Sequence, residues 1–144
     1  YQPVWQPLEP MVAQAVSGVH LSGVEISTRM APVEVYADRL SPKVVYNLVE
    51  NAVRHGGEVG RICITTSERD DGTLVVAFED DGPGVPEGEK ERIFSYGHGK
   101  NTGFGLAFSR DILSVTDIEI RETGMAGRGA RFEILVPPRA WRPV

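Results

Sequence analysis

Cysteine, extended apolar runs and clustered positive charge are all scarce in this sequence of 144 residues. The single cysteine, Cys63, excludes an internal disulfide, and its place in the apolar run at residues 62–64 favours a buried structural thiol in a reducing compartment. No apolar stretch approaches the ~18 residues of a membrane-spanning helix, and the N-terminus lacks a signal-peptide pattern. We therefore predict a soluble chain.

Neither acidic nor basic residues are clustered in the sequence. The net charge is −5, acidic and basic residues are interspersed, and no basic run is longer than two residues. This pattern disfavours nucleic acid or an anionic membrane as the main partner. The length suits one domain, residues 1–144, that buries about 68% of the surface of its unfolded chain. Because the sequence starts at Tyr1 with prolines close behind, we expect a domain cut from a longer protein.

Residue periodicity predicts a mixture of helices and strands. Apolar residues spaced along one helical face predict helices at residues 8–19, 40–57, a short segment ending near 94, and 105–115. Runs of β-forming residues predict strands at residues 24–30, 33–37, 61–67, 73–79, 118–122 and 131–136. Pro32 would join the first two strands as a hairpin, and Asp71 with Gly72 would join the next two. Without regular βαβ alternation, we predict an α+β fold with one antiparallel or mixed sheet covered by helices on one face.

The predicted helix at residues 40–57 contains two asparagines one turn apart. Ser41 is a start signal because its oxygen can cap free N–H groups, Pro42 suits the first turn, and two glycines mark the end. Asn is a poor helix former, so Asn47 and Asn51 each carry a cost of roughly several tenths of a kcal/mol. Both could simply bond to neighbouring loops, but such a cost also hints at a ligand.

This helix has a polar and an apolar stripe. The polar stripe contains Lys43, Asn47, Glu50 and Arg54, and the opposite stripe contains Val45, Leu48, Val49 and Ala52. Asn51 falls on the border between the two stripes. An amide at that border would be half buried without capping the helix.

Two glycine-containing motifs follow the helix in a specific order. Residues 79–86, EDDGPGVP, come directly after a predicted strand, and residues 103–106, GFGL, open a predicted helix. Neither motif is informative alone, since Asp, Gly and Pro populate any tight turn. The ordered set of an asparagine helix, a DxGxG turn and a GxGL helix start resembles the GHKL superfamily of ATP-binding domains, and within it the catalytic domain of sensor histidine kinases. The resemblance covers about residues 24–137 and implies a two-layer, Bergerat-type α/β sandwich.

The resemblance implies that the asparagine helix binds ATP and Mg²⁺. Asn51 matches the metal-binding asparagine of the family, and its neutral amide oxygen suits Mg²⁺. Asn47 stands where hydrolysing branches carry a glutamate that activates water; an amide cannot act as that general base, so the site looks suited to phosphate transfer. Glu50 is either a carboxylate near the metal with a catalytic role or a solvated helix residue. Arg54 would meet phosphate and His55 would replace an adenine-facing aromatic ring, unless both are surface residues.

In the DxGxG turn, the resemblance makes Asp80 the acceptor for the adenine amine. Gly82 and Gly84 would let the backbone approach the base without a Cβ in the way, and Val85 would lie in the same pocket. A buried carboxylate that reads a donor amine disfavours guanine, which presents a carbonyl there. Asp81 is the variable position of the motif.

The GFGL helix start is expected to lie near the phosphates, because free N–H groups and the helix dipole attract anions. The resemblance makes residues 95–102 an ATP lid and Phe94 part of the apolar anchor before it. At the other end of the chain, the GARF sequence matches a closing GTxF motif with alanine in place of threonine. The nucleotide-binding residues expected from these segments are Lys100, Thr102, Gly103, Gly105, Leu106 and Ala130, with Lys100 also a catalytic candidate.

None of His20, His55 or His98 has the setting of a phosphoacceptor histidine on a helix. The resemblance therefore implies a protein histidine kinase domain that binds ATP and phosphorylates a separate dimerisation and phosphoacceptor domain of the same kinase, with a response regulator as an indirect partner. It also implies an isolated monomer, a full-length homodimer, and a cytoplasmic domain whether or not the full-length protein is membrane-anchored. An anti-sigma-factor-type serine kinase, which usually has glutamate at the position of Asn47, and a non-catalytic ATP-binding regulatory module are the alternatives.

Overall fold

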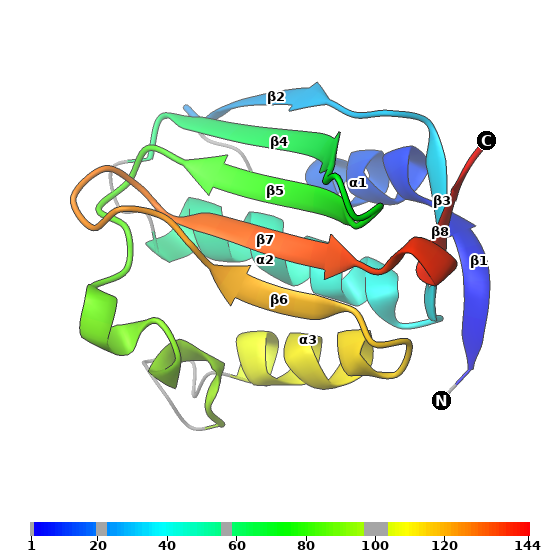
Figure 1. The fold of residues 1–144 in the computed structure, drawn as a ribbon. Coiled ribbons are helices and arrows are strands. Elements are labelled where there is room, and N and C mark those ends of the chain that lie inside the picture. The colour runs from blue at the N-terminus through cyan, green and yellow to red at the C-terminus, as the bar shows by residue number, and fades with distance from the viewer. Residues whose placement is uncertain (1, 20–22, 56–58, 97–103) are drawn as a thin grey trace.

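The computed structural model describes residues 2–19, 23–55, 59–96 and 104–144, which form two sheets and three α-helices (Figure 1). The helices are α1 (Leu8–Ser17), α2 (Ser41–His55) and α3 (Phe104–Ser114). The five-stranded sheet has the order β2 (Glu25–Arg29), β4 (Arg61–Glu68), β5 (Leu74–Asp80), β7 (Arg131–Val136) and β6 (Glu119–Glu122). The three-stranded sheet has the order β1 (Pro3–Pro7), β3 (Val33–Asp38) and β8 (Trp141–Pro143).

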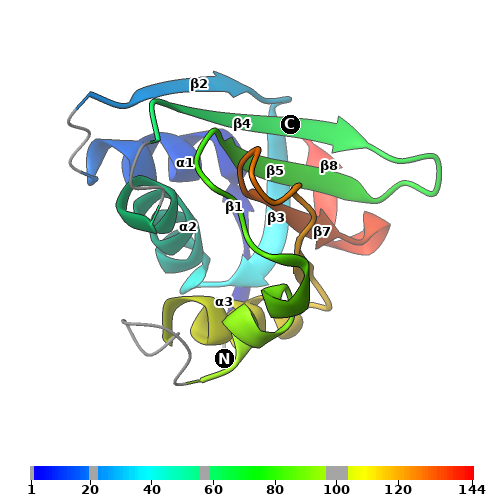
Figure 2. The ribbon, with the colours of Figure 1, turned by 90° about the vertical axis from the view of Figure 1, so that its left-hand side faces the viewer.

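The three helices lie on one face of the five-stranded sheet, as two views at right angles show (Figures 1 and 2). Within that sheet β2 pairs with β4 in parallel, and all other neighbours are antiparallel. Alternate residues of the strands, such as Ile62, Ile64, Val76 and Phe78, are buried in the core. The predicted α+β sandwich with a mixed, mostly antiparallel sheet is confirmed.

Helix α2 is held against the sheet by an apolar stripe. Val44, Val45, Leu48 and Val49 are all buried, and burying such a side chain contributes roughly 1.5–3 kcal/mol. The predicted stripe is confirmed at Val45, Leu48 and Val49, whereas Ala52 is half-buried. One face of α2 is thus fixed in the core, and the other remains available for a site.

The predicted hairpin of residues 24–30 and 33–37 is wrong, although both strands exist. β2 pairs with β4 and β3 pairs with β1 and β8, so the two strands belong to different sheets. Alternation indicates which side chains face a core, but it carries no information about which strand lies alongside. The second predicted hairpin is confirmed, with β4 and β5 in antiparallel register.

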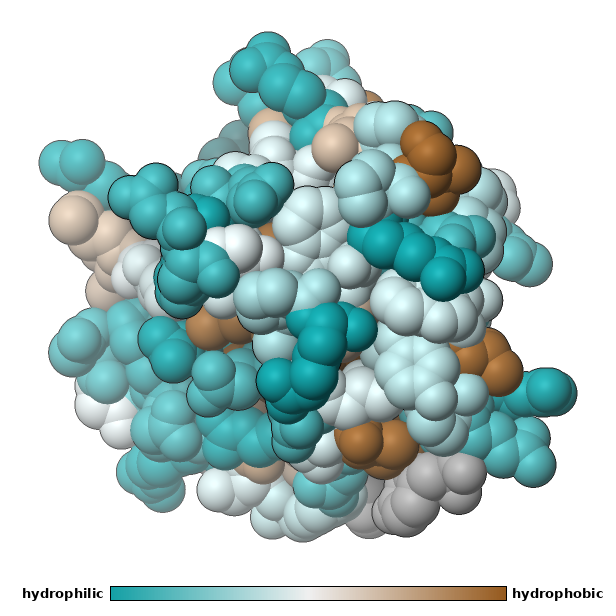
Figure 3. All heavy atoms as spheres, turned by 45° about the vertical axis from the view of Figure 1, so that its right-hand side comes forward, coloured by the Kyte–Doolittle hydropathy of each residue, from teal (hydrophilic) through white to brown (hydrophobic). Residues whose placement is uncertain are grey.

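The three-stranded sheet was not predicted, because β1 and β8 are short and contain prolines. Its side chains pack through aromatic contacts: the Trp5 ring lies 5.2 Å from the Tyr36 ring, and the Arg142 guanidinium lies 4.0 Å from the centre of the Trp5 ring. Figure 3 shows the molecule turned toward this side, where hydrophobic residues form separate small patches among polar ones.

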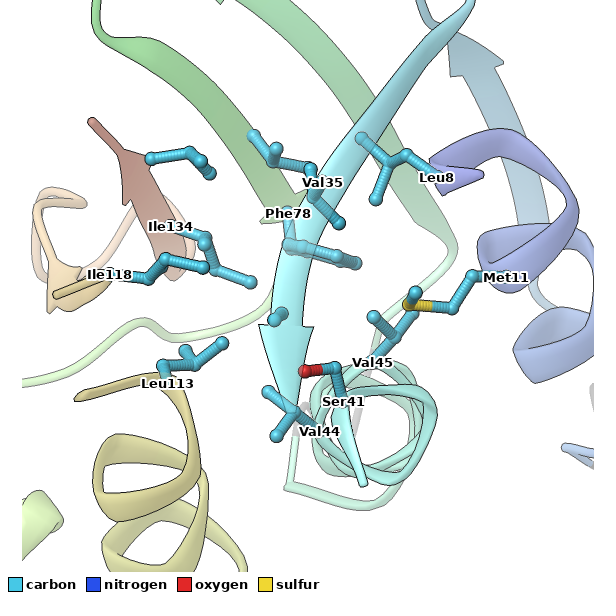
Figure 4. A pocket seen from close by; sticks show the side chains of 13 residues that line it. Leu8, Met11, Val35, Ser41, Val44, Val45, Phe78, Leu113, Ile118 and Ile134 are labelled. Atoms are coloured by element: carbon cyan, nitrogen blue, oxygen red, sulfur yellow. The ribbon is translucent and has the colours of Figure 1, made fainter. Parts of the chain in front are cut away.

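The predicted cap of α2 by Ser41 is wrong. The Ser41 side chain is buried, and its Oγ has no hydrogen-bond partner. It lines a cavity of about 30 Å³ with apolar residues from α1, α2 and the neighbouring strands (Figure 4). Ser41 lies on the same helical face as Val44 and Val45, so packing turns its hydroxyl toward the core. Just before the helix, Asp38 Oδ1 accepts a hydrogen bond from the Leu40 N–H at 2.9 Å.

Two smaller expectations also change. The short helix predicted before residue 94 is replaced by the 3₁₀ turns η1 (Glu87–Glu89) and η2 (Arg92–Phe94), since so short a segment gains too few α-helical hydrogen bonds to offset nucleation. Cys63 is half-buried rather than buried, because Ile62 and Ile64 take the core-facing positions on either side. A further 3₁₀ turn, η3 (Pro138–Ala140), precedes β8.

Candidate functional site

Asp80, the last residue of β5, has one carboxylate oxygen held by the main chain. Its Oδ1 accepts the Gly82 N–H at 2.9 Å and the Ala130 N–H at 3.1 Å, and its own N–H donates to the Ala130 carbonyl at 3.0 Å. Among the described residues no donor contacts Oδ2. The half-buried carboxylate therefore presents one fixed, unused acceptor at the end of the sheet.

The turn after Asp80 packs against the loop between β6 and β7 (Figure 1). Gly84 has φ +77°, and a Cβ there would lie 2.9 Å from the Gly129 carbonyl oxygen. Gly129 has φ +126°, and a Cβ there would lie only 1.9 Å from the Asp80 carbonyl oxygen. The Gly127 N–H donates to the Pro83 carbonyl at 2.7 Å. Glycine is thus required at positions 84 and 129 because the two backbones touch.

Asp81 ties the same turn to the beginning of β4. Its Oδ1 accepts the Gly60 N–H at 2.9 Å and the Arg61 N–H at 3.1 Å. These backbone hydrogen bonds favour the charged form and lower the pKa of Asp81. Its contribution to stability is therefore present at neutral pH and is lost only as the pH falls through the lowered pKa. Asp81 thus has a structural role, because it holds the turn against the beginning of β4.

Asn47 lies beside the start of α3. A Cβ on Gly105 would lie 3.7 Å from Asn47 Nδ2, which is an ordinary contact distance, so the first turn of α3 lies directly against Asn47 of α2. Ser109 Oγ donates to the Gly105 carbonyl at 2.5 Å within α3. Asn51 is half-buried, as expected for the border between the two stripes, and Asn47, which was predicted on the polar stripe, is half-buried as well. The structure therefore brings the asparagine helix and the GFGL helix start together.

Glu50 and Arg54 form an ion pair one turn apart on the polar stripe. Their side chains are 36% and 47% exposed, and such surface pairs contribute about 0–1 kcal/mol. The pair is therefore weak enough to open for another partner.

Several predicted site residues cannot be placed. The side chain of His55 and residues Lys100, Thr102 and Gly103 lie outside the described residues, as does the predicted lid apart from Ser95 and Tyr96. Val85, Leu106 and Ala130 are half-buried, and Ala130 forms hydrogen bonds with Asp80.

Phe94 is buried before the predicted lid, as expected for an anchor. Its ring packs edge-on against Phe132, with the ring centres 6.2 Å apart, and the Arg110 guanidinium lies 4.2 Å from the centre of the Phe94 ring. Arg110 also pairs with Glu91 at 3.4 Å. The segment that enters residue 95 is thus fixed to β7 and α3.

Sequence reasoning missed a buried ion pair between Lys90 and Glu122. Glu122 Oε2 accepts the Gly124 and Arg131 N–H groups, both at 3.0 Å, at the two ends of the β6–β7 loop. A signal was available: Ile118, Ile120 and Glu122 alternate, so the glutamate belongs to the inward-facing set.

In the described parts of the chain, no group of three or more His, Cys, Asp and Glu side chains is placed to hold a metal ion. Within the same parts of the chain, no helix has the length and apolar character needed to cross a membrane.

The family model described as histidine kinase-, DNA gyrase B-, and HSP90-like ATPase matches residues 37–140. The alginate biosynthesis sensor protein KinB of Pseudomonas aeruginosa is 37% identical over 106 residues, which are 69% of this chain and 18% of that protein. The adaptive-response sensory kinase SasA of Crocosphaera subtropica is 36% identical over 112 residues, which are 72% of this chain and 29% of that protein. The chain thus spans less than a third of the length of these relatives.

Solved structures share the fold. The mycobacterial sensor histidine kinase MprB superposes with a TM-score of 0.82 at 19% identity, covering 99% of each chain. Full-length ShkA in complex with AMPPNP gives a TM-score of 0.80 at 24% identity, covering 95% of this chain and 32% of that one. The matched residues 37–140 contain Asp80, Gly129 and both asparagines of α2. The chain therefore belongs to the GHKL family of ATPases, as an ATP-binding domain of the sensor histidine kinase type.

Proposed function

We propose that this domain binds ATP with Mg²⁺ and donates the γ-phosphate to a histidine on a separate dimerisation and phosphoacceptor domain of the same kinase. The observation that carries the proposal is the Asp80 carboxylate, whose Oδ1 is held by two N–H groups while Oδ2 receives no donor from the described part of the chain. The glycine turn after Asp80, the asparagine face of α2 and the first turn of α3 supply the remaining surfaces for a nucleotide.

Asp80 is expected to select adenine. Oδ2 can accept a hydrogen bond from the exocyclic amine of adenine, whereas guanine presents a carbonyl at that position and would place two acceptors together. The close approach of the backbones at Gly84 and Gly129 fixes the direction of this acceptor. ATP should therefore bind more tightly than GTP.

Asn51 is the residue that we expect to bind Mg²⁺. Asn51 is half-buried on α2, one turn beyond Asn47, which adjoins the start of α3. Mg²⁺ needs only one or two protein oxygens when phosphates and water complete its shell, so a single amide fits. When bound, the ion would neutralise negative charge on the phosphates.

Asn51→Ala is expected to abolish the gain in ATP affinity that Mg²⁺ gives the wild-type domain, because it removes the protein ligand. Calorimetric titrations with ATP in the presence and absence of Mg²⁺ measure that gain. Lys43→Ala, at an exposed position of the same helix, should keep it. An Asn51→Ala domain whose affinity still rises with Mg²⁺ would assign the metal to another residue.

Transfer rather than hydrolysis is expected because Asn47 supplies no general base. General-base help contributes about 10²–10⁴ in rate, so attack by water should be slow without it. An imidazole nitrogen is already a good nucleophile; it forms the P–N bond as the bond between the γ-phosphorus and ADP breaks, and it then releases its proton. Glu50 faces Arg54, which leaves Asn47 as the polar group beside the start of α3.

The experiment that tests transfer combines the domain with the phosphoacceptor domain of the same kinase and γ-labelled ATP. We expect slow ATP hydrolysis by the domain alone, little change in Glu50→Gln, and labelled phosphohistidine once the acceptor domain is added. Brisk hydrolysis that Glu50→Gln stops would instead identify Glu50 as a general base. Label on serine would favour the serine kinase alternative, and ATP binding without any transfer would favour a regulatory module.

A further inference from the structure

The buried pair of Lys90 and Glu122 lies behind the adenine end of the proposed site. The Glu122 side chain is fully buried and that of Lys90 is 17% exposed. Lys90 Nζ also donates to the Gly124 carbonyl at 2.8 Å. One oxygen of Glu122 faces Lys90, and the other accepts the Gly124 and Arg131 N–H groups. The pair therefore holds together the two ends of the β6–β7 loop, at Gly124 and Arg131.

A single peptide group connects this pair to Asp80. The peptide between Ala130 and Arg131 donates its N–H to Glu122 Oε2 at 3.0 Å, and its carbonyl accepts the Asp80 N–H at 3.0 Å. Because a peptide group is planar, fixing the direction of its N–H also fixes the direction of its carbonyl. The preceding N–H, that of Ala130, donates to Asp80 Oδ1. Glu122 and Asp80 thus hold two consecutive N–H groups of the chain.

Stability alone gives little reason for charged residues at this place. A buried ion pair gains little over well-packed apolar residues, because both charges lose their hydration. Here, however, the carboxylate satisfies two main-chain donors besides the lysine, which an apolar residue could not do. The hydrogen bonds from Gly124 and Arg131 therefore explain why a charged residue stands at position 122: its carboxylate orients these main-chain groups.

We propose that Glu122, held in place by Lys90, is a positioning residue that orients the Asp80 carboxylate toward the amine of the adenine base. This inference rests on the proposed reading of adenine by Asp80. Glu122 touches no nucleotide in this scheme; it acts through the peptide between Ala130 and Arg131. Loss of the pair should therefore impair recognition of the adenine amine more than it impairs binding of the rest of the nucleotide.

The test compares ATP with purine riboside 5′-triphosphate, which lacks the 6-amine, by calorimetry on the wild type and on Glu122→Gln. A hydrogen bond to a charged group supports roughly tenfold or greater preference for ATP in the wild type. Glu122→Gln keeps the side-chain shape but places an NH₂ group against either Lys90 or the two N–H groups. We expect the preference for ATP to fall by about fivefold or more in this variant, on the scale of one hydrogen bond.

Glu119→Gln is the matched control, because Glu119 lies on the same strand with a side chain that is 66% exposed. It should keep the wild-type preference. Should Glu122→Gln fail to fold, Lys90→Met and Lys90→Arg replace it: the first should lose the preference and the second, which retains the charge, should restore most of it. A wild type without any preference for ATP overturns the proposed function and this inference together. A preference that survives in Glu122→Gln and Lys90→Met, even with equally weakened binding of both nucleotides, overturns the inference alone.

Discussion

Asp80→Asn is expected to weaken ATP binding at least about 30-fold while leaving the fold intact. In Asp80 the two N–H donors of Gly82 and Ala130 hold Oδ1. An asparagine would keep its carbonyl oxygen on those donors, which places its NH₂ group where Oδ2 faces the base. Two donors would then meet at the adenine amine, and an unpaired buried donor costs about 2 kcal/mol or more.

Calorimetry with ATP measures the loss, and thermal unfolding checks the fold. Asp81→Asn is the matched control, because Asp81 also accepts two main-chain N–H groups through one oxygen but holds the beginning of β4. It should bind ATP within a few-fold of the wild type. If Asp80→Asn binds ATP as tightly as Asp81→Asn does, the carboxylate does not read the base.

Gly129→Ala is expected to cost about 3 kcal/mol or more in the free energy of unfolding and to abolish ATP binding. The positive φ of Gly129 costs alanine about 1–2 kcal/mol. The added Cβ would also lie 1.9 Å from the Asp80 carbonyl oxygen, which is too close for any heavy atom. To relieve the contact, Asp80 and Ala130 must separate, and the hydrogen bonds between them break.

Gly127→Ala separates the two causes of that loss. Gly127 also has a positive φ, +87°, but a Cβ there meets nothing within 4 Å. It should therefore lose only the roughly 1–2 kcal/mol of backbone strain and should retain ATP binding. Denaturant unfolding and nucleotide titration of both variants give the comparison. Equal effects of the two substitutions would show that contact with Asp80 is not what requires glycine at position 129.

Much of the fold could be predicted because the apolar patterns are regular. Val45, Leu48 and Val49 recur at helical spacing, and the strands on either side of Gly72 are runs of β-forming residues, so α2 and the β4–β5 hairpin follow from local rules. Strand partners do not follow from such rules. β2 and β3 are separated by only three residues, yet they enter different sheets, a choice that depends on tertiary packing.

The residues of the candidate site also divide into those that a local motif identifies and those that depend on distant contacts. Asp80 and Asn47 were recognisable because each stands in a local motif, a DxGxG turn or an asparagine helix. Glu122 was not, because its role depends on a lysine 32 residues away and on main-chain N–H groups of a loop. Gly129 was expected only as the first residue of the GARF motif, because its contact with Asp80 joins two distant segments. Ser41 begins α2 as predicted, but its hydroxyl is buried and does not cap the helix, because packing against the core decides where the side chain points.

The hydrogen bond from Ala130 to Asp80 joins residues that are 50 positions apart in the chain. The remaining groups of the proposed site come from α2 and α3, which are separated along the chain by the strands β4 and β5 and the 3₁₀ turns η1 and η2. No continuous fragment shorter than α2 through β7 contains them all. A bound nucleotide should therefore stabilise the whole domain against unfolding, because any partly folded form that lacks one of these segments also lacks the site.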